Sequence, residues 1–147
     1  MTDDRTLRRA AAGLAVLVAA IHLYWAMPVL LRQLQAGLIH DPRPIAFVIA
    51  SAAIVAGVTL TALGAERRPF YLGGIALMAV FLVGYAAWHT VLDHGAFWPG
   101  RPAYHHHDQG FITIMVTHLA DDPIALVSKT AELALLTLLG VLYVRER

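Results

Sequence analysis

Four long apolar stretches dominate the pattern of hydrophobic and polar positions along the chain. They cover about residues 10–31, 44–64, 70–92 and 123–144, and polar segments separate them. About 20 apolar residues in a helix cross a hydrocarbon core of about 30 Å. Because a backbone in lipid must satisfy its own hydrogen bonds, each stretch is predicted to be a helix. The pattern therefore predicts an all-α integral membrane protein, a four-helix bundle forming one transmembrane domain over residues 1–147.

The third polar link, residues 94–122, is longer than the other two and holds an apolar piece of its own, FITIMVTHL. Asp108 precedes this piece, and a short polar residue before an apolar run is typical of a helix start. We expect a short helix here that lies at the membrane interface and caps one end of the bundle. Asp122 before Pro123 marks the start of the fourth span.

Composition agrees with a membrane location and narrows the function. Of the 147 residues, 59% are hydrophobic and 14% are charged, whereas a soluble domain carries about 25% charged residues. The chain has no cysteine, which excludes disulfides and thiolate metal sites. The net charge is +1 and no basic run is interleaved with aromatic residues, so nucleic acid is excluded as a partner. Membrane lipid is the expected environment.

Arginine placement predicts the orientation of the bundle by the positive-inside rule. Seven arginines fall on the side of the two termini and three on the opposite side. The seven are Arg5, Arg8, Arg9, Arg67, Arg68, Arg145 and Arg147, and the three are Arg32, Arg43 and Arg101. The bias predicts a multi-pass protein of the cell membrane with both termini in the cytoplasm and the third link outside.

None of the eight histidines falls on the cytoplasmic side of this topology. At a rise of about 1.5 Å per residue, His22, His89, Lys129 and Glu132 all lie in the outer half of the bilayer. Ionisable groups at this depth are costly toward lipid, so they should face the bundle interior and pair with one another. Lys129 and Glu132 are three residues apart on one helix face and can pair directly.

These positions predict a polar site in the outer half of the bundle that binds a metal ion or a small ligand. Imidazole and carboxylate groups suit copper or zinc. The candidate metal ligands are His22, His89, Glu132, Asp93 and His94. The candidate ligand-binding residues are Tyr24, Trp25, Tyr85, Lys129 and Glu132. A separate metal site in the outer link would use His105, His106, His107 and His118.

Other interpretations of the same residues stay open. Lys129 and Glu132 can be an internal ion pair of a structural or accessory subunit, which would act through a partner subunit or as a homo-oligomer. His22 and His89 on different helices can ligate haem b, the weaker alternative because their depths differ. A His/Glu/Lys group can also perform acid–base chemistry on a lipid-like substrate, so the sequence does not decide whether the protein is an enzyme.

The stretch IHLYWAMP places His22, Tyr24, Trp25 and Ala26 in an H-x-Y-W-A element. This element resembles one in the first span of an uncharacterised family of small four-span prokaryotic membrane proteins. The chain length, the four spans and the outer third link are also similar to that family. The family pattern continues with Gly-Gly soon afterwards, whereas this chain has Met27 and Pro28. The resemblance implies only that His22, Tyr24 and Trp25 belong to a shared feature.

Overall fold

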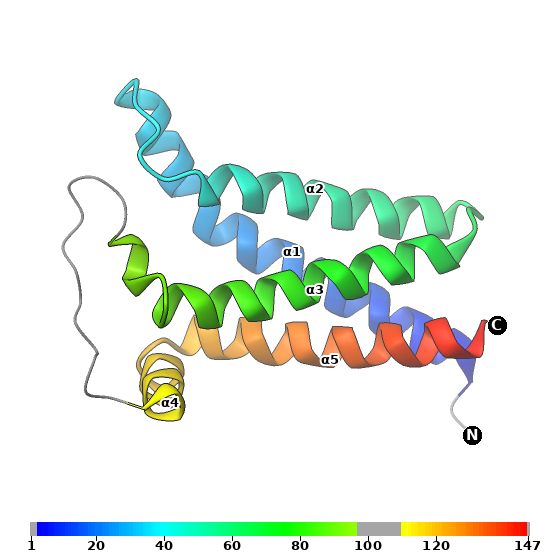
Figure 1. Ribbon diagram of the computed structural model, residues 1–147. Coiled ribbons are helices and arrows are strands. Elements are labelled where there is room, and N and C mark those ends of the chain that lie inside the picture. The colour runs from blue at the N-terminus through cyan, green and yellow to red at the C-terminus, as the bar shows by residue number, and fades with distance from the viewer. Residues whose placement is uncertain (1–2, 97–109, 147) are drawn as a thin grey trace.

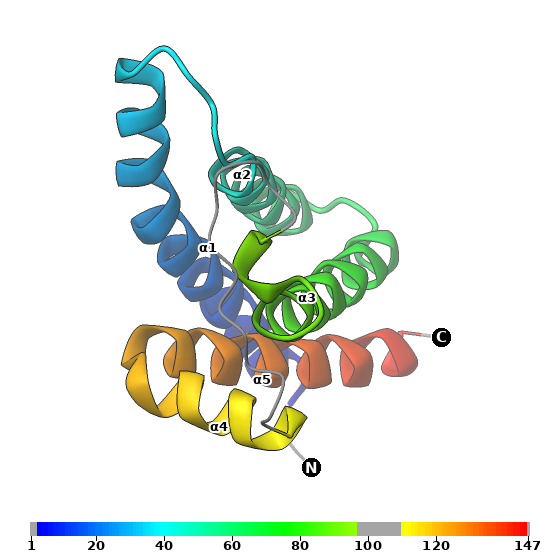
Figure 2. The same cartoon turned by 60° about the vertical axis from the view of Figure 1, so that its left-hand side comes forward.

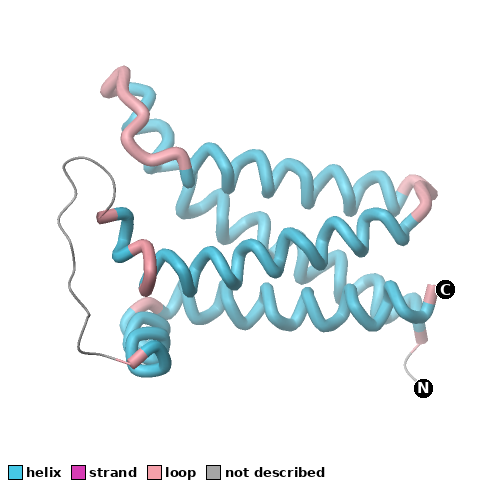
Figure 3. The backbone as a smooth tube through the Cα atoms, in the orientation of Figure 1, coloured by secondary structure: helices cyan, strands magenta, loops and turns pink. Residues whose placement is uncertain are grey.

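The computed structural model describes residues 3–96 and 110–146, and within them the chain is helical with no strand (Figure 3). Four helices are long and apolar enough to cross a membrane, which confirms the predicted all-α fold with four spans. These are α1 (Asp4–Gln35), α2 (Arg43–Ala62), α3 (Arg67–His89) and α5 (Pro123–Arg145). Between α3 and α5 lie a short 3-10 turn, η1 (Asp93–Gly95), and the predicted short helix, α4 (Phe111–Asp121).

The four long helices alternate in direction, so the two ends of the bundle differ (Figure 1). One end, here called the terminus end, holds the N-terminus, the C-terminus and the link between α2 and α3. The other, the distal end, holds the link between α1 and α2 together with η1 and α4. In Figure 1, α4 is seen nearly along its own axis, so it lies across the long helices, and Figure 2 shows it beside the start of α5.

Small residues on one face of α1 let the neighbouring helices approach closely. Ala11, Ala15, Ala19 and Ala26 are buried at helical spacing, and α1 packs against both α2 and α5. Small residues are typical of contacts between membrane helices because lipid supplies no hydrophobic force to join them. His22 lies on this same buried face, which explains why a polar residue of α1 points into the bundle.

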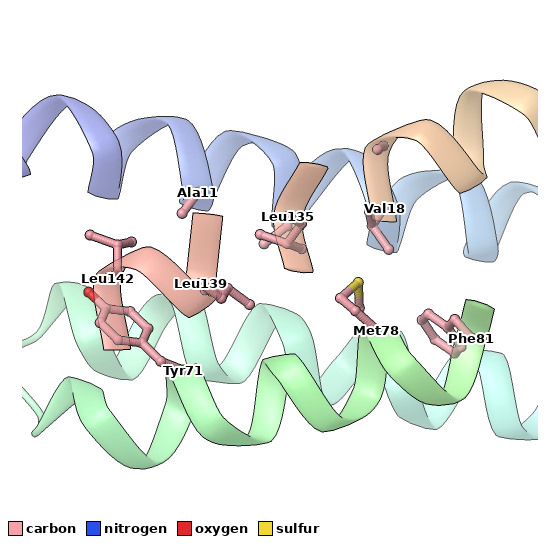
Figure 4. Close-up of a cluster of buried hydrophobic side chains, with 10 residues drawn as sticks. Ala11, Val18, Tyr71, Met78, Phe81, Leu135, Leu139 and Leu142 are labelled. Atoms are coloured by element: carbon pink, nitrogen blue, oxygen red, sulfur yellow. The ribbon is translucent and has the colours of Figure 1, made fainter. Parts of the chain in front are cut away.

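The core continues with an apolar stripe on α5 that meets α3 (Figure 4). Leu135, Leu139 and Leu142 recur every three or four residues and pack with Met78 of α3. Glu132 lies one turn before Leu135 on the same face, and it is fully buried as a result. Most other large apolar side chains point outward, as expected for helices that face lipid.

Two helix ends differ from the predicted spans. α1 begins at Asp4 because the side chain of Asp3 accepts a hydrogen bond from the backbone N–H of Arg5 at 3.3 Å. The third span was predicted to reach Leu92, but α3 ends at His89. The chain turns sharply beyond this point because Asp93, at φ +42°, adopts a left-handed backbone conformation that cannot continue a right-handed helix.

The distal end is braced by an ion pair stacked on tryptophan. Arg43 donates hydrogen bonds to both carboxylate oxygens of buried Asp41. Its guanidinium group lies 3.5 Å from the ring centroid of Trp88 and 5.3 Å from that of Trp25. Gln33 exchanges two further hydrogen bonds with the backbone of Asp41. These contacts tie the link after α1 to the end of α3, directly beside η1.

Candidate functional site

The predicted site residues gather in two groups rather than one. The first, here called the acid cluster, consists of His22, Ser128, Lys129 and Glu132. The second, here called the histidine cluster, consists of His89, His94 and His118. The structure thus places His22 and Glu132 in one group and His89 in the other, and it does not bring these three candidate metal ligands together.

Glu132 is the centre of the acid cluster and has no exposed surface. Lys129 Nζ donates to both carboxylate oxygens, at 2.6 and 2.7 Å, and the hydroxyl of Ser128 donates to Oε1 at 2.9 Å. All three residues come from α5, with Ser128 and Lys129 four and three residues before Glu132. The predicted direct pairing of Lys129 with Glu132 is confirmed, and it supplies the hydrogen bonds that a buried carboxylate needs.

His22 joins the acid cluster from α1. Its Nδ1–H donates to the carbonyl of Val18 at 2.9 Å, and its Nε2 lies 3.5 Å from Glu132 Oε1. Phe81 stacks on the imidazole with ring centroids 4.2 Å apart, and Phe47 meets it edge-on at 4.8 Å. The acid cluster is thus enclosed by aromatic rings and joins α1 to α5 through one polar contact.

The histidine cluster brings together three imidazoles from α3, η1 and α4. One ring nitrogen from each of His89, His94 and His118 lies within 4.8 Å of the others. The closest two, His94 Nε2 and His118 Nε2, are 3.2 Å apart. The ring centroid of His89 lies 4.9 Å from that of His94 and 4.6 Å from that of His118. All three side chains are half-buried, so a small ion can reach them.

Backbone hydrogen bonds set the direction in which two of these rings point. His89 Nδ1 lies 2.8 Å from the carbonyl of Tyr85, and His118 Nδ1 lies 2.8 Å from that of Ile114. A carbonyl oxygen can only accept, so Nδ1 carries the hydrogen in both rings. In the neutral ring Nε2 then keeps its lone pair, the arrangement found in metal-binding histidines whose other nitrogen donates to a carbonyl.

His94 enters the histidine cluster from an unusual backbone. Asp93 and His94 have φ values of +42° and +54°, and Gly95 follows at +86°. Left-handed conformations at residues other than glycine are uncommon and cost about 1–3 kcal/mol each. Trp88 packs so closely on Gly95 that a Cβ there would lie 2.7 Å from the indole Cη2. This strained turn is what carries the imidazole of His94 over His118.

Tyr85 lies between the two clusters. Its ring centroid is 4.1 Å from that of His89, and Lys129 Nζ lies 5.0 Å from the same ring. Asp93, a candidate metal ligand, lies in η1, beyond the end of α3. Its carboxylate is 4.0 Å from His94 Nδ1 and outside the group of three nitrogens.

The remaining predicted residues are placed apart from both clusters or lie outside the described residues. Tyr24 is 70% exposed, because two residues rotate a helix by about 200° from His22. Trp25 packs on Phe47 with centroids 5.4 Å apart and thus touches the wall of the acid cluster only indirectly. The outer-link ligands His105, His106 and His107 lie outside the described residues.

His118 was assigned to the outer-link site, whereas the structure places it with His89 and His94. The sequence did contain a signal for this grouping. His89 lies near the end of the predicted third span and His94 two residues beyond it. His118 stands four residues before Asp122, which marks the start of the fourth span, so all three lie at the same end of the bundle. His22 and His89, the pair considered for haem, belong to different clusters.

Comparisons with known proteins add no function to this geometry. No family model matches the chain, and no curated protein or solved structure matches it either. The resemblance carried by His22, Tyr24 and Trp25 therefore stays a prediction. The functional argument rests on the two clusters and on the four helices that are long and apolar enough to cross a membrane.

Proposed function

We propose that this membrane-spanning protein binds a divalent zinc or copper ion at its distal end through His89, His94 and His118. One observation carries the proposal: nitrogens of three imidazoles, from three separate elements, lie within 4.8 Å of one another. Imidazole is a preferred ligand of both metals, and three histidines form a complete protein ligand set for zinc.

The shortest nitrogen–nitrogen distance supports this assignment. Two nitrogens bound at about 2.0–2.1 Å to one tetrahedral zinc lie about 3.3–3.4 Å apart. The Nε2 atoms of His94 and His118 are separated by 3.2 Å. His89 has its Nδ1–H tied to the Tyr85 carbonyl, so its Nε2 supplies the third lone pair after a small rotation. Binding one ion would draw the three nitrogens, now within 4.8 Å of one another, toward this separation.

The backbone strain at Asp93 and His94 supports a binding role over a purely structural one. Strained backbone persists where the surrounding structure enforces it, and it gathers at ligand sites. A helix end that needs only a turn most often has glycine at its left-handed position. Here glycine occupies only the third position, and the second presents the imidazole of His94.

A metal held by three histidines keeps one coordination position for water or a small anion. A zinc ion in such a site lowers the pKa of bound water and polarises oxygen ligands. We also propose that the site faces the outside of the cell membrane. The support is the arginine bias, because seven arginines lie on the side of the two termini.

For the acid cluster we propose a structural role as the second function. The carboxylate of Glu132 is satisfied within α5, while His22 and its aromatic neighbours enclose it. This closure favours an internal tie between α5 and α1 over acid–base chemistry, which needs access for a substrate. The cluster would then position Tyr85, and through it His89, beneath the metal.

The proposal is tested by measuring zinc and copper in protein purified without a polyhistidine tag. Because the chain holds further histidines at 105–107, all proteins in the comparison carry His105→Ala, His106→Ala and His107→Ala. We expect one metal per chain by elemental analysis, and a loss of affinity of at least about tenfold in His94→Ala and His118→Ala.

His40→Ala is the matched control, since this exposed histidine also lies near the distal end but outside the histidine cluster. Its affinity should equal that of the parent. Equal metal binding by the parent, His94→Ala and His118→Ala would overturn the proposal, and so would a parent that stays metal-free when zinc and copper are added. Helical circular dichroism checks that each variant remains folded.

A further inference from the structure

A cavity of about 940 Å³ lies at the terminus end, away from both clusters. Residues of α1, α2, α3 and α5 line it, mostly with apolar surface. Small residues leave this space open, because Ala11, Ala12, Ala15 and Gly73 line it and a Cβ at Gly73 would meet nothing within 4 Å. A cavity of this size matches the range of about 300–1,000 Å³ that is typical of ligand pockets.

Four arginines line the same cavity, and three of them form no ion pair with the acidic residues that the structure describes. They are Arg5, Arg8, Arg9 and Arg67. Arg8 Nε lies 3.6 Å from Glu146 Oε1. Within residues 3–96 and 110–146, no ion pair involves the side chains of Arg5, Arg9 or Arg67. An apolar cavity with unpaired arginines at one end favours a ligand that has an apolar chain and an anionic headgroup.

The length of the cavity fits one leaflet of a membrane. Its lining runs along α1 from Arg5 to Ala15 and along α3 from Arg67 to Met78. Ten or eleven residues of helix rise by about 15 Å, half of a hydrocarbon core of about 30 Å. The arginines occupy the first two turns of α1 and the first residue of α3, at the level where lipid headgroups lie. The apolar part then reaches toward the bilayer midplane.

We propose that this cavity binds one anionic phospholipid from the leaflet at the terminus end. An acyl chain lies along the alanine and glycine lining, and the phosphate pairs with Arg5, Arg9 and Arg67. Because α2 and α3 make few contacts with each other, the chain can enter sideways between them. A phosphate oxygen accepts two hydrogen bonds from a guanidinium fork, which neutral side chains on this surface do not supply.

Charge argues against a second copy of the protein as the occupant. A partner docking with the same surface would place its arginines against Arg5, Arg9 and Arg67, and like charges brought together at an interface are strongly unfavourable. A zwitterionic lipid carries its own cation and gains less from the arginines than an anionic one. The proposal is independent of the metal site, which lies at the opposite end of the bundle.

Native mass spectrometry of the detergent-solubilised protein tests whether the cavity prefers an anionic headgroup. Phosphatidylglycerol and phosphatidylcholine with the same acyl chains are offered in competition. We expect one retained phosphatidylglycerol per chain. In Arg9→Gln/Arg67→Gln its affinity should fall by about 25-fold, since each cation near an anionic headgroup contributes about fivefold. The matched control, Arg68→Gln/Arg145→Gln, removes two charges from the same end but leaves the cavity lining intact.

A second pair of variants tests the acyl chain. Gly73 lines the cavity and Gly84 does not, yet both lie on α3 in open space for a side chain. Gly73→Leu should reduce binding of phosphatidylglycerol at least tenfold, whereas Gly84→Leu should leave it unchanged. Equal affinities for the two lipids, equal loss in the two arginine pairs, or a lipid-free dimer across this face would each overturn the proposal.

Discussion

The Nε2 atoms of His94 and His118 face each other at 3.2 Å, although 24 residues separate them in the chain. The contact joins a left-handed turn after α3 to the last turn of α4. Two lone pairs cannot meet at this distance without a proton or a cation between them. With His118 Nδ1 donating to Ile114, either His94 supplies a proton or a metal takes its place. Because a proton and a metal ion compete for the same position, metal binding by the histidine cluster should depend on pH.

Zinc binding is expected to weaken as the pH falls, because protons compete with zinc for the imidazole nitrogens that hold it. The affinity should fall more steeply for a site of three histidines than for one that has lost His94 or His118, because fewer nitrogens then compete. Isothermal titration calorimetry at several pH values measures this dependence. An affinity that stays unchanged as the pH falls would contradict binding through histidine.

Gly95→Ala should weaken zinc binding by about tenfold or more while the four spanning helices stay folded. The new Cβ would lie 2.7 Å from Trp88 Cη2, at a residue whose φ of +86° disfavours any side chain. The turn must shift, and it moves His94 away from His118. Gly110→Ala is the control, because Gly110 has an ordinary φ of −67° and open space around it. Equal zinc affinity in the two variants would contradict this role for Gly95.

Arg43→Leu should lower the free energy of unfolding by about 3 kcal/mol, since it leaves the buried carboxylate of Asp41 without its cation. Arg43→Lys should cost less, because lysine keeps the charge but loses the planar fork and the stacking on Trp88. Unfolding in a denaturing detergent, followed by circular dichroism, measures both. If Arg43→Lys proved as unstable as Arg43→Leu, geometry rather than charge would hold the pair.

The four spans and the residues of the acid cluster could be predicted from the sequence, because they depend on hydropathy and helical spacing within short segments. Hydropathy over about 20 residues finds a spanning helix without knowledge of its neighbours. His22 and Glu132 were expected at similar depth in the outer half, and the structure brings them to 3.5 Å. Helical spacing then fixed Lys129 on the same face as Glu132.

The histidine cluster could not be predicted in the same way. Its three side chains come together only through the turn after α3 and through the direction in which α4 lies. The period of α3 predicts where His89 points, but it does not predict the left-handed backbone of Asp93 and His94. Asp and His adopt that conformation more often than most residues do, but the periodic pattern does not mark where it occurs. The direction of α4, which decides whether His118 faces the bundle, depends on contacts made after the spans have assembled.

The strongest test of the acid cluster compares one substitution with two. Glu132 is fully buried and is paired with Lys129. Lys129→Leu alone leaves the buried carboxylate without this cation and should lower the free energy of unfolding by about 3–5 kcal/mol. Lys129→Leu/Glu132→Met removes both charges, and well-packed apolar residues often replace a buried ion pair without loss. The double variant should therefore unfold at a temperature close to that of the parent, while the single variant unfolds well below it.

The same double variant separates structure from chemistry, because its zinc affinity is measured alongside its stability. If the acid cluster only ties α5 to α1, the double variant keeps its zinc affinity, as Tyr85 still packs on His89. A folded double variant that no longer binds zinc would show that the charges of the acid cluster act on the metal site. Lys129→Leu, whose fold is weakened, cannot make that distinction, so the comparison rests on the double variant and the parent.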